Sequence, residues 1–128
     1  VRHARDGVRA VAWRRLQQLA QKIARQRHLR VQFKMMHSAA AVACAREFTQ
    51  TLAQAVQKHQ PRVLRLPSGA GHDAAVMAAI TPVAMLFVRC RRGISHHPAE
   101  SVRVADIAIA LRVMTDFLVR QGRKHESA

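Results

Sequence analysis

Residues 66–100 read LPSGAGHDAAVMAAITPVAMLFVRCRRGISHHPAE, and the order of these parts indicates the fold class. Val83–Val88 is a continuous apolar run, which is typical of a strand covered on both faces. A glycine-containing loop precedes it and a histidine-containing loop follows it. Ligand sites of α/β sheets gather at the carboxyl ends of strands. We therefore predict an α/β fold in which Ser68–His72 and Ile94–His97 lie at one edge.

The rest of the chain shows both helical and strand periodicity. Apolar residues spaced by three and four predict helices over residues 7–28, 45–59, 74–80 and 105–120. Alternation predicts a half-buried strand over 29–36, and a short apolar run predicts another over 63–66. Asp6 is the expected N-cap of the first helix, and Trp13 is expected to pack beside its apolar stripe. The last helix is expected to bury a stripe made of Ile107, Ala110, Leu111, Met114, Phe117 and Leu118.

Composition narrows the function classes. The chain has 128 residues, the length of one ordinary domain, and 49% are apolar, which excludes wholesale disorder. Two cysteines are too few for a disulfide scaffold and fit a reducing, cytoplasmic compartment. The apolar runs are too short to cross a membrane.

Charge is the strongest compositional bias. The chain carries 22 Lys and Arg against 7 Asp and Glu, a formal net charge of +15. Single-strand binders interleave aromatic and basic residues, and no such pattern is visible here. We therefore expect a solvated basic face and no nucleic-acid or membrane partner. The alternative hypothesis is a non-catalytic, basic interaction fragment that binds polyanions.

The first loop, Ser68–Gly71, has two glycines between a predicted strand and a predicted helix. Glycine admits positive φ and lets backbone N–H groups approach a ligand, and a following helix N-terminus favours anions. His72 and Asp73 add ionisable groups at the same place. By itself the pattern is also compatible with an ordinary tight turn.

The second loop places His96, His97 and Glu100 after the buried run. Neutral imidazole is the commonest metal ligand, and a nearby carboxylate usually orients it. A catalytic zinc needs about three protein ligands, however, and one loop supplies one or two. From spacing alone, surface histidines beside a turn are slightly favoured.

Together the segments Leu66–Ala74, Met85–Val88 and Gly93–Glu100 resemble the signature of the allantoate amidohydrolase and N-carbamoyl-L-amino-acid hydrolase family. This family belongs to the aminoacylase and carboxypeptidase clan of metal hydrolases. The resemblance covers nearly the whole chain. It implies that residues 1–38 are the C-terminal part of an α+β dimerisation (lid) domain. It implies that residues 39–128 are the C-terminal part of the metal-dependent α/β catalytic domain, and that the complete enzyme is a homodimer.

The resemblance also implies roles for single residues. His96 matches a ligand of a centre that holds two divalent metals, zinc or manganese, and Arg2 and Gly71 match residues that bind the carboxylate of a small-molecule substrate. His72, Asp73 and Glu100 are possible supporting residues. The other metal ligands and the general-base Glu of the family lie in a region that this chain lacks. We therefore expect a hydrolase of C–N bonds in ureido or N-carbamoyl compounds that is inactive as this chain alone.

The family pattern selects His96 rather than His97 as the metal-facing residue. Adjacent side chains in an extended loop point in opposite directions, so one shared centre receives only one of them. The sequence departs from the family at Arg89, where Pro is common, and at Arg92, where Gly or a small polar residue is common. Two cations near a metal-bound histidine disfavour a dication unless they point to solvent.

Overall fold

The computed structural model describes the backbone of residues 1–126 and the side chains of residues 1–123. The chain divides into two compact units. Unit 1 comprises Val1–Ala43 and Leu66–Gly71, and unit 2 comprises Cys44–Arg65 and the chain from His72 onward. The chain therefore passes between the units after Ala43, Arg65 and Gly71.

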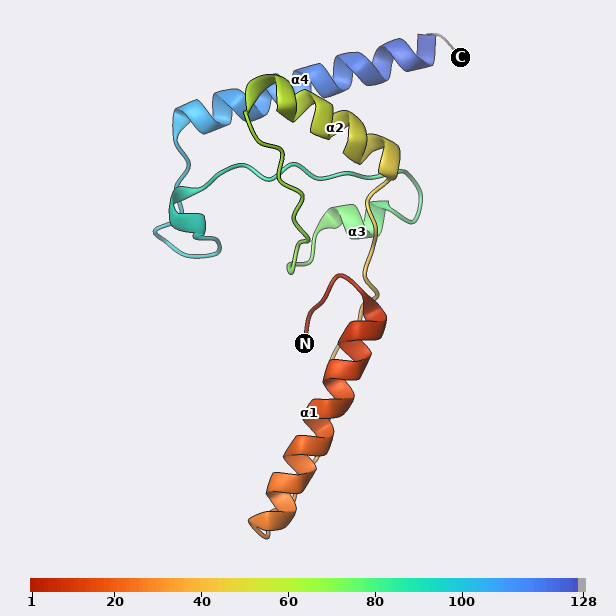
Figure 1. The fold of residues 1–128 in the computed structure, drawn as a ribbon, viewed down its shortest axis with the longest axis vertical. Coiled ribbons are helices and arrows are strands. Elements are labelled where there is room, and N and C mark those ends of the chain that lie inside the picture. The colour runs from red at the N-terminus through yellow and green to blue at the C-terminus, as the bar shows by residue number, and fades with distance from the viewer. Residues whose placement is uncertain (127–128) are drawn as a thin grey trace. The chain divides into compact units, whose positions relative to one another are not determined.

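Unit 1 is built on α1 (Asp6–Gln26), which confirms the helix predicted over 7–28. The segment after it runs back along the helix (Figure 1). Trp13 of α1 meets Phe33 of this segment edge to face, with ring centroids 5.5 Å apart and an interplanar angle of 86°. Edge-to-face contact is a favoured geometry for aromatic pairs, so the predicted packing role of Trp13 is confirmed.

The C-terminus of α1 is closed by a left-handed residue. His28 has φ 55°, its N–H donates to Arg25 O at 3.2 Å, and Leu29 N donates to Ala24 O at 2.8 Å. These two bonds form a Schellman motif, in which the left-handed position is usually glycine. The motif turns the chain so that the following segment can return along the helix.

Asp6 does not cap α1 as predicted. The N-cap position belongs to Arg5, which makes no side-chain cap bond, and Asp6 is the first helical residue. Both carboxylate oxygens of Asp6 lie 3.1 Å from the backbone N of Ala41, which donates to them. The Asp6 carboxylate does accept a backbone N–H, as an N-cap would, but that N–H belongs to Ala41 and not to α1.

Unit 2 contains α2 (Arg46–His59), the short α3 (Asp73–Met77), the 3₁₀ turn η1 (Arg91–Gly93) and α4 (Val104–Glu126). The helices predicted over 45–59 and 105–120 are confirmed, and the one predicted over 74–80 is shorter than expected. Over residues 1–126, no helix combines the length and apolar character that crossing a membrane requires.

The core of unit 2 lies between α2 and α4. Leu52 and Ala55 of α2 and Val113 of α4 are buried, and Val113 is 1% exposed. Phe48 and Phe117 meet edge to face beside them, with ring centroids 5.7 Å apart. Fully burying a Leu or Val side chain stabilises a fold by about 1.5–3 kcal/mol, so this cluster dominates the stability of the unit.

The stripe predicted for the last helix is largely on the wrong face. Ile107, Leu111 and Leu118 are 45%, 63% and 61% exposed. Val113, which the prediction omitted, is buried, and Ile109 and Phe117 pack against the core. α4 therefore has two apolar faces, and α2 covers only one of them.

The predicted α/β class is not confirmed, because residues 1–126 form no β-strand. Residues 29–36, 63–66 and 83–88 lie outside the helices, as the strand predictions require, but no strand pairs with them. A helix closes its hydrogen bonds within itself, whereas a strand needs a neighbour. The chain therefore carries strand-like apolar patterns, but the described residues form no sheet from them.

Candidate functional site

The glycine-containing loop is held by Arg2. The Arg2 guanidinium, at Nη1, donates to Gly69 O at 2.5 Å, and both residues belong to unit 1. Within the loop, Ala70 N donates to Ser68 Oγ at 3.1 Å. Neither Gly69 nor Gly71 has a positive φ, and a Cβ on either would meet nothing within 4 Å. The glycines of this loop therefore leave its backbone open rather than enabling a strained turn.

His72 and Asp73 lie at the start of α3 in unit 2. His72 is its N-cap residue, and its carbonyl accepts from Ala75 N at 2.9 Å. α3 has only five residues, so few peptide dipoles align behind the loop. The anion attraction expected from a following helix is correspondingly small.

The histidine-containing loop begins with a left-handed turn. Arg92 has φ 57° and ψ 16°, Gly93 has φ 68°, and Ile94 N donates to Arg91 O at 3.2 Å. Two successive positive φ values closed by this bond make a type I′ turn, which favours glycine or asparagine at both central positions. Arg92 is thus a residue with a Cβ at a turn position that favours glycine or asparagine.

Glu100 braces the loop around the two histidines. Its carboxylate accepts from the backbone N of His96 at 2.9 Å, and its own N–H donates to His97 O at 2.8 Å. His96 has φ 58°, an uncommon value for a residue with a side chain. Glu100 therefore supports His96 through the backbone, which is a more specific role than sequence analysis gave it.

The two imidazoles have different surroundings. His97 Nδ1 accepts from Ala99 N at 3.1 Å, which in the neutral ring leaves the proton on Nε2. Within the described part of the chain, the His96 ring makes no hydrogen bond. The His96 ring thus keeps a nitrogen lone pair available, while the acceptor nitrogen of His97 is already engaged.

Arg89 contacts two residues that sequence analysis did not single out. Arg89 Nε lies 3.7 Å from Asp106 Oδ1, and its Nη2 donates to Gln60 Oε1 at 2.5 Å. Asp106 also accepts from Arg103 Nε at 2.8 Å. Asp106 therefore shares one negative charge between Arg103 and the more distant Arg89, so the three side chains together keep a net positive charge.

Two carboxylates of unit 2 have pKa values below the ordinary value of an Asp side chain. The hydrogen bond from Arg103, with further attraction from Arg89, holds the pKa of Asp106 below its ordinary value, although burial opposes the shift. Hydrogen bonds from Lys58 and His59, whose donor atoms lie 3.1 and 3.0 Å from Asp116 Oδ2, likewise lower the pKa of Asp116. Both carboxylates are therefore held in the ionised form by partners on other elements or on the preceding turn.

The site residues predicted from sequence fall into two groups. Arg2 and Gly71 belong to unit 1, and the arginine binds the loop that contains the glycine. His72, Asp73, His96 and Glu100 belong to unit 2, where His96 and Glu100 are hydrogen-bonded. Among the residues that the structure describes, no three His, Cys, Asp or Glu side chains come together as metal ligands would.

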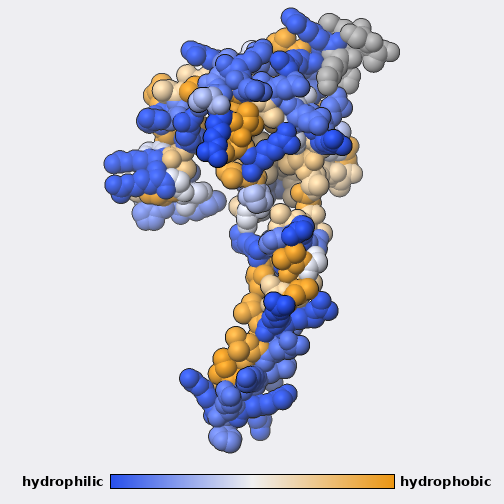
Figure 2. All heavy atoms as spheres, viewed as in Figure 1, coloured by the Kyte–Doolittle hydropathy of each residue, from blue (hydrophilic) through white to orange (hydrophobic). Residues whose placement is uncertain are grey.

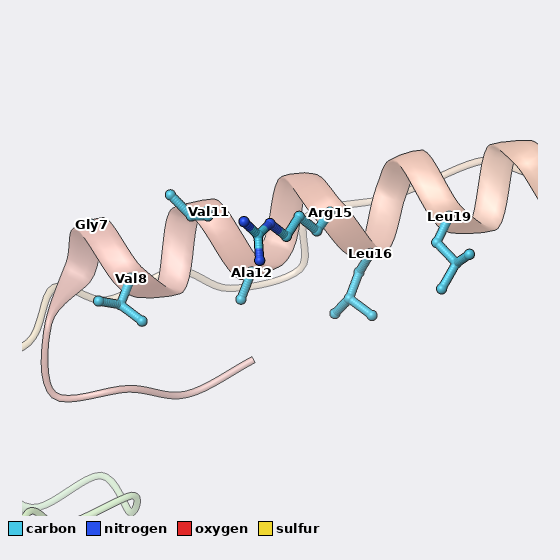
Figure 3. Close-up of a pocket in the computed structure, with 7 residues that line it drawn as sticks. All are labelled: Gly7, Val8, Val11, Ala12, Arg15, Leu16 and Leu19. Carbon is cyan, nitrogen blue, oxygen red and sulfur yellow. The ribbon is translucent and has the colours of Figure 1, made fainter.

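A hollow of about 560 Å³ lies elsewhere, along one face of α1 (Figure 3). It is lined by Gly7, Val8, Val11, Ala12, Arg15, Leu16 and Leu19. All of these come from one helix, and none is a predicted site residue. Figure 2 shows the same apolar surface along α1. The hollow is an exposed helix face rather than a catalytic cavity.

Known proteins resemble this chain over most of its length. Residues 4–120 match the family described as Peptidase family M20/M25/M40. The chain is 32% identical over 124 residues to an N-carbamoyl-L-amino acid amidohydrolase of Geobacillus stearothermophilus, covering 95% of this chain and 30% of that protein. It is 55% identical over 62 residues to an allantoate deiminase of Arabidopsis thaliana, covering 48% of this chain and 12% of that protein.

An allantoate amidohydrolase of Escherichia coli is 33% identical over 73 residues, covering 57% of this chain and 18% of that protein. No solved structure matches the chain. The chain spans less than a third of the length of each of these three relatives. Because the family match extends over most of the sequence, the chain belongs to peptidase family M20/M25/M40.

Proposed function

We propose that this chain forms part of the active site of an amidohydrolase that cleaves linear C–N bonds in N-carbamoyl amino acids or allantoate. The observation that carries the proposal is the family match over residues 4–120, together with relatives whose names state these two substrates. The chain spans less than a third of those relatives, so we propose that it is inactive by itself.

Arg2 and Gly71 are the proposed binding residues for the substrate carboxylate. Arginine presents five N–H donors in a planar fork, and only Nη1 is used on Gly69 O. The N–H of Gly71 has no hydrogen-bond partner within the described residues. A guanidinium bound to this loop, together with a free backbone N–H of the loop itself, supplies the charge and the directed donors that a carboxylate requires.

The residues of this chain do not fit a divalent metal on their own. A metal site of this class needs several imidazole or carboxylate ligands, and no such group of three exists among the described side chains. We propose only that His96 offers one ligand, while any others come from outside this chain. The free His96 ring and the engaged Nδ1 of His97 favour this choice between the two histidines.

The remaining parts of the proposal follow from the resemblance. We propose that residues 1–38 are the end of a lid domain, that residues 39–128 belong to the catalytic domain, and that the complete enzyme is a cytoplasmic homodimer. Polyanion binding is not favoured as the function, because the family match and the names of the relatives support an amidohydrolase instead.

A chimaera tests the proposal. The 124-residue segment of the Geobacillus relative that aligns with this chain is replaced by this chain, and hydrolysis of N-carbamoyl-L-amino acids and metal content are measured. In the active chimaera, His96→Ala should remove metal and lower kcat/KM by about a hundredfold or more, since even indirect supports of metal ligands contribute 10- to 100-fold. Arg2→Ala should mainly raise KM.

His97→Ala is the matched control and should leave metal content and turnover within about twofold. If His97→Ala removes the metal while His96→Ala retains it, the ligand assignment is wrong. If the chimaera is folded and metal-loaded but hydrolyses no N-carbamoyl amino acid and no allantoate, the proposed activity is wrong. Turnover by the 128-residue chain alone would contradict its proposed inactivity.

A further inference from the structure

The first turn of α1 binds the backbone of a distant segment. Ala41 N donates to both carboxylate oxygens of Asp6, each 3.1 Å away. Arg9 Nη2 lies 2.9 Å from Asp6 Oδ1, and Arg9 Nη1 donates to Ala39 O. All four residues belong to unit 1. Two side chains of opposite charge therefore hold one backbone N–H and one backbone carbonyl of the segment 39–41.

The segment that they bind has little else to hold it. Residues 37–43 read HSAAAVA, form no helix or strand, and are all exposed. Short alanine side chains bury little apolar area, so packing contributes little order here. Apart from the Asp6 and Arg9 contacts, the described residues make no hydrogen bond to the backbone of 39–43. The order of this segment therefore depends on those two side chains.

The segment 39–41 lies just before the point where the chain passes from unit 1 to unit 2. Ala43 is the last residue of unit 1 before the chain enters unit 2, and Arg2 holds Gly69 close to the passage after Gly71. We propose that Asp6 and Arg9 are positioning residues that anchor the linker to α1 as far as Ala41. Only Val42, Ala43 and Cys44 then lie between this anchor and Ala45, whose N–H donates to Val83 O within unit 2. The proposal does not depend on the proposed enzymatic activity.

Two local measurements on the 128-residue chain test this inference. Elastase cleaves after small residues, so its rate within residues 39–43 reports how well the linker is held. NMR hydrogen exchange at the Ala41 amide reports the hydrogen bond itself. Asp6→Ala should accelerate both by about tenfold, because a bond from an N–H to a charged acceptor is lost. Arg9→Ala should accelerate cleavage by a few fold, and the double variant should exceed Asp6→Ala only slightly.

A charge-shift variant distinguishes two explanations. Asp6 could act by binding the Ala41 N–H, or by stabilising α1 as any acidic residue in its first turn would. Asp6→Ala combined with Gly7→Asp moves the carboxylate by one residue, and a side chain at Gly7 meets nothing within 4 Å. This variant keeps the favourable interaction with the helix dipole but loses the acceptor for Ala41. Exchange at Ala41 should stay fast while exchange in the middle of α1 matches the wild type.

Arg14→Ala removes an exposed cation of α1 that makes no contact within the described residues, and it should change neither rate. The inference is overturned if Asp6→Ala leaves Ala41 exchange and linker cleavage unchanged. It is also overturned if the charge-shift variant restores Ala41 protection, because helix stabilisation would then explain the effect of Asp6.

Discussion

α1 in unit 1 and the α2–α4 pair in unit 2 are both amphipathic, but they differ in what covers their apolar faces. Leu52, Ala55 and Val113 of the pair are buried, the last two to 1% exposure or less. On α1, only Ala24 is buried, and Leu16 and Leu19 are 49% and 54% exposed. An amphipathic helix can therefore form while its apolar face stays exposed. A core forms only where a second apolar surface of the same chain covers that face.

This difference also explains the exposed outer face of α4. Ile109, Val113 and Phe117 of α4 belong to the core that α4 shares with α2, while Ile107, Leu111 and Leu118 are 45–63% exposed. Hydrophobic stabilisation scales with the apolar area that is removed from water. Stability should therefore depend strongly on one face of α4 and weakly on the uncovered faces of α4 and α1.

A charged residue on each kind of face gives the largest predicted contrast. Val113→Asp places an unpaired carboxylate in the buried cluster and should destabilise unit 2 by about 3 kcal/mol or more. Leu16→Asp places the same group on the open face of α1 and should destabilise it by only about 1 kcal/mol, through helix propensity and the half-exposed apolar area. Urea unfolding, followed by hydrogen exchange at amides of each helix, measures both. Comparable destabilisation by the two variants would contradict the difference between the units.

Acid should act on unit 2 through Asp106 and Asp116. Partners lower the pKa of both carboxyls in the folded state, so the unfolded chain binds more protons than the folded chain as the pH falls. Their contribution is complete above the ordinary carboxyl pKa of about 3.9 and is lost as the pH falls through the lower, folded values. Unfolding below that point should take up at most about two protons from these groups.

Unfolding of α2 and α4 measured between pH 6 and pH 2 checks this expectation. Asp106→Asn and Asp116→Asn remove the titrating groups while keeping a side chain of similar size. Each should flatten the pH dependence below about pH 4. An unchanged slope in both variants would show that other groups set the acid stability of unit 2.

Sequence predicted the helices well and the sheet poorly, for a physical reason. The period of α1, α2 and α4 is visible locally because helical hydrogen bonds join residues four apart. The buried face of α4 was missed because it depends on which side α2 approaches, and the local period does not contain that information. The strand-like runs at 29–36 and 83–88 need neighbours that the described residues do not provide.

The candidate site was likewise predictable as residue types but not as contacts. The motif drew attention to Glu100 and His96, but the hydrogen bond from the His96 N–H to the Glu100 carboxylate could not be deduced from spacing. Pairing of Arg89 with Asp106 joins residues 17 positions apart and has no local pattern. Neither Gly69 nor Gly71 has a positive φ, whereas Arg92 and Gly93 do, and the departure at Arg92 from the Gly or small polar residue of the resembling family was the available signal.

The smallest predicted effects concern one left-handed residue in each unit. His28 closes the Schellman motif of α1 with φ 55°, and Arg92 occupies the type I′ turn with φ 57°. A residue with a Cβ is strained there by about 1–2 kcal/mol, while glycine loses about 0.5–1 kcal/mol more in conformational entropy on folding. The net expectation for His28→Gly and for Arg92→Gly is a gain of about 0.5–1 kcal/mol in the unit that contains each residue.

Arg27, the neighbour of His28, provides a matched control for His28→Gly. Arg27 has φ −101°, so Arg27→Gly adds flexibility without relieving strain and should destabilise α1 by a few tenths of a kcal/mol, up to about 1. Thermal unfolding compares it with His28→Gly in the same helix. Opposite signs at positions 27 and 28 would show that backbone strain, rather than loss of a long side chain, controls the effect. Destabilisation by both would mean that the left-handed turn is not strained. The effect of Arg92→Gly on stability, measured in the same way, shows whether the histidine-containing loop of unit 2 is strained as the end of α1 is.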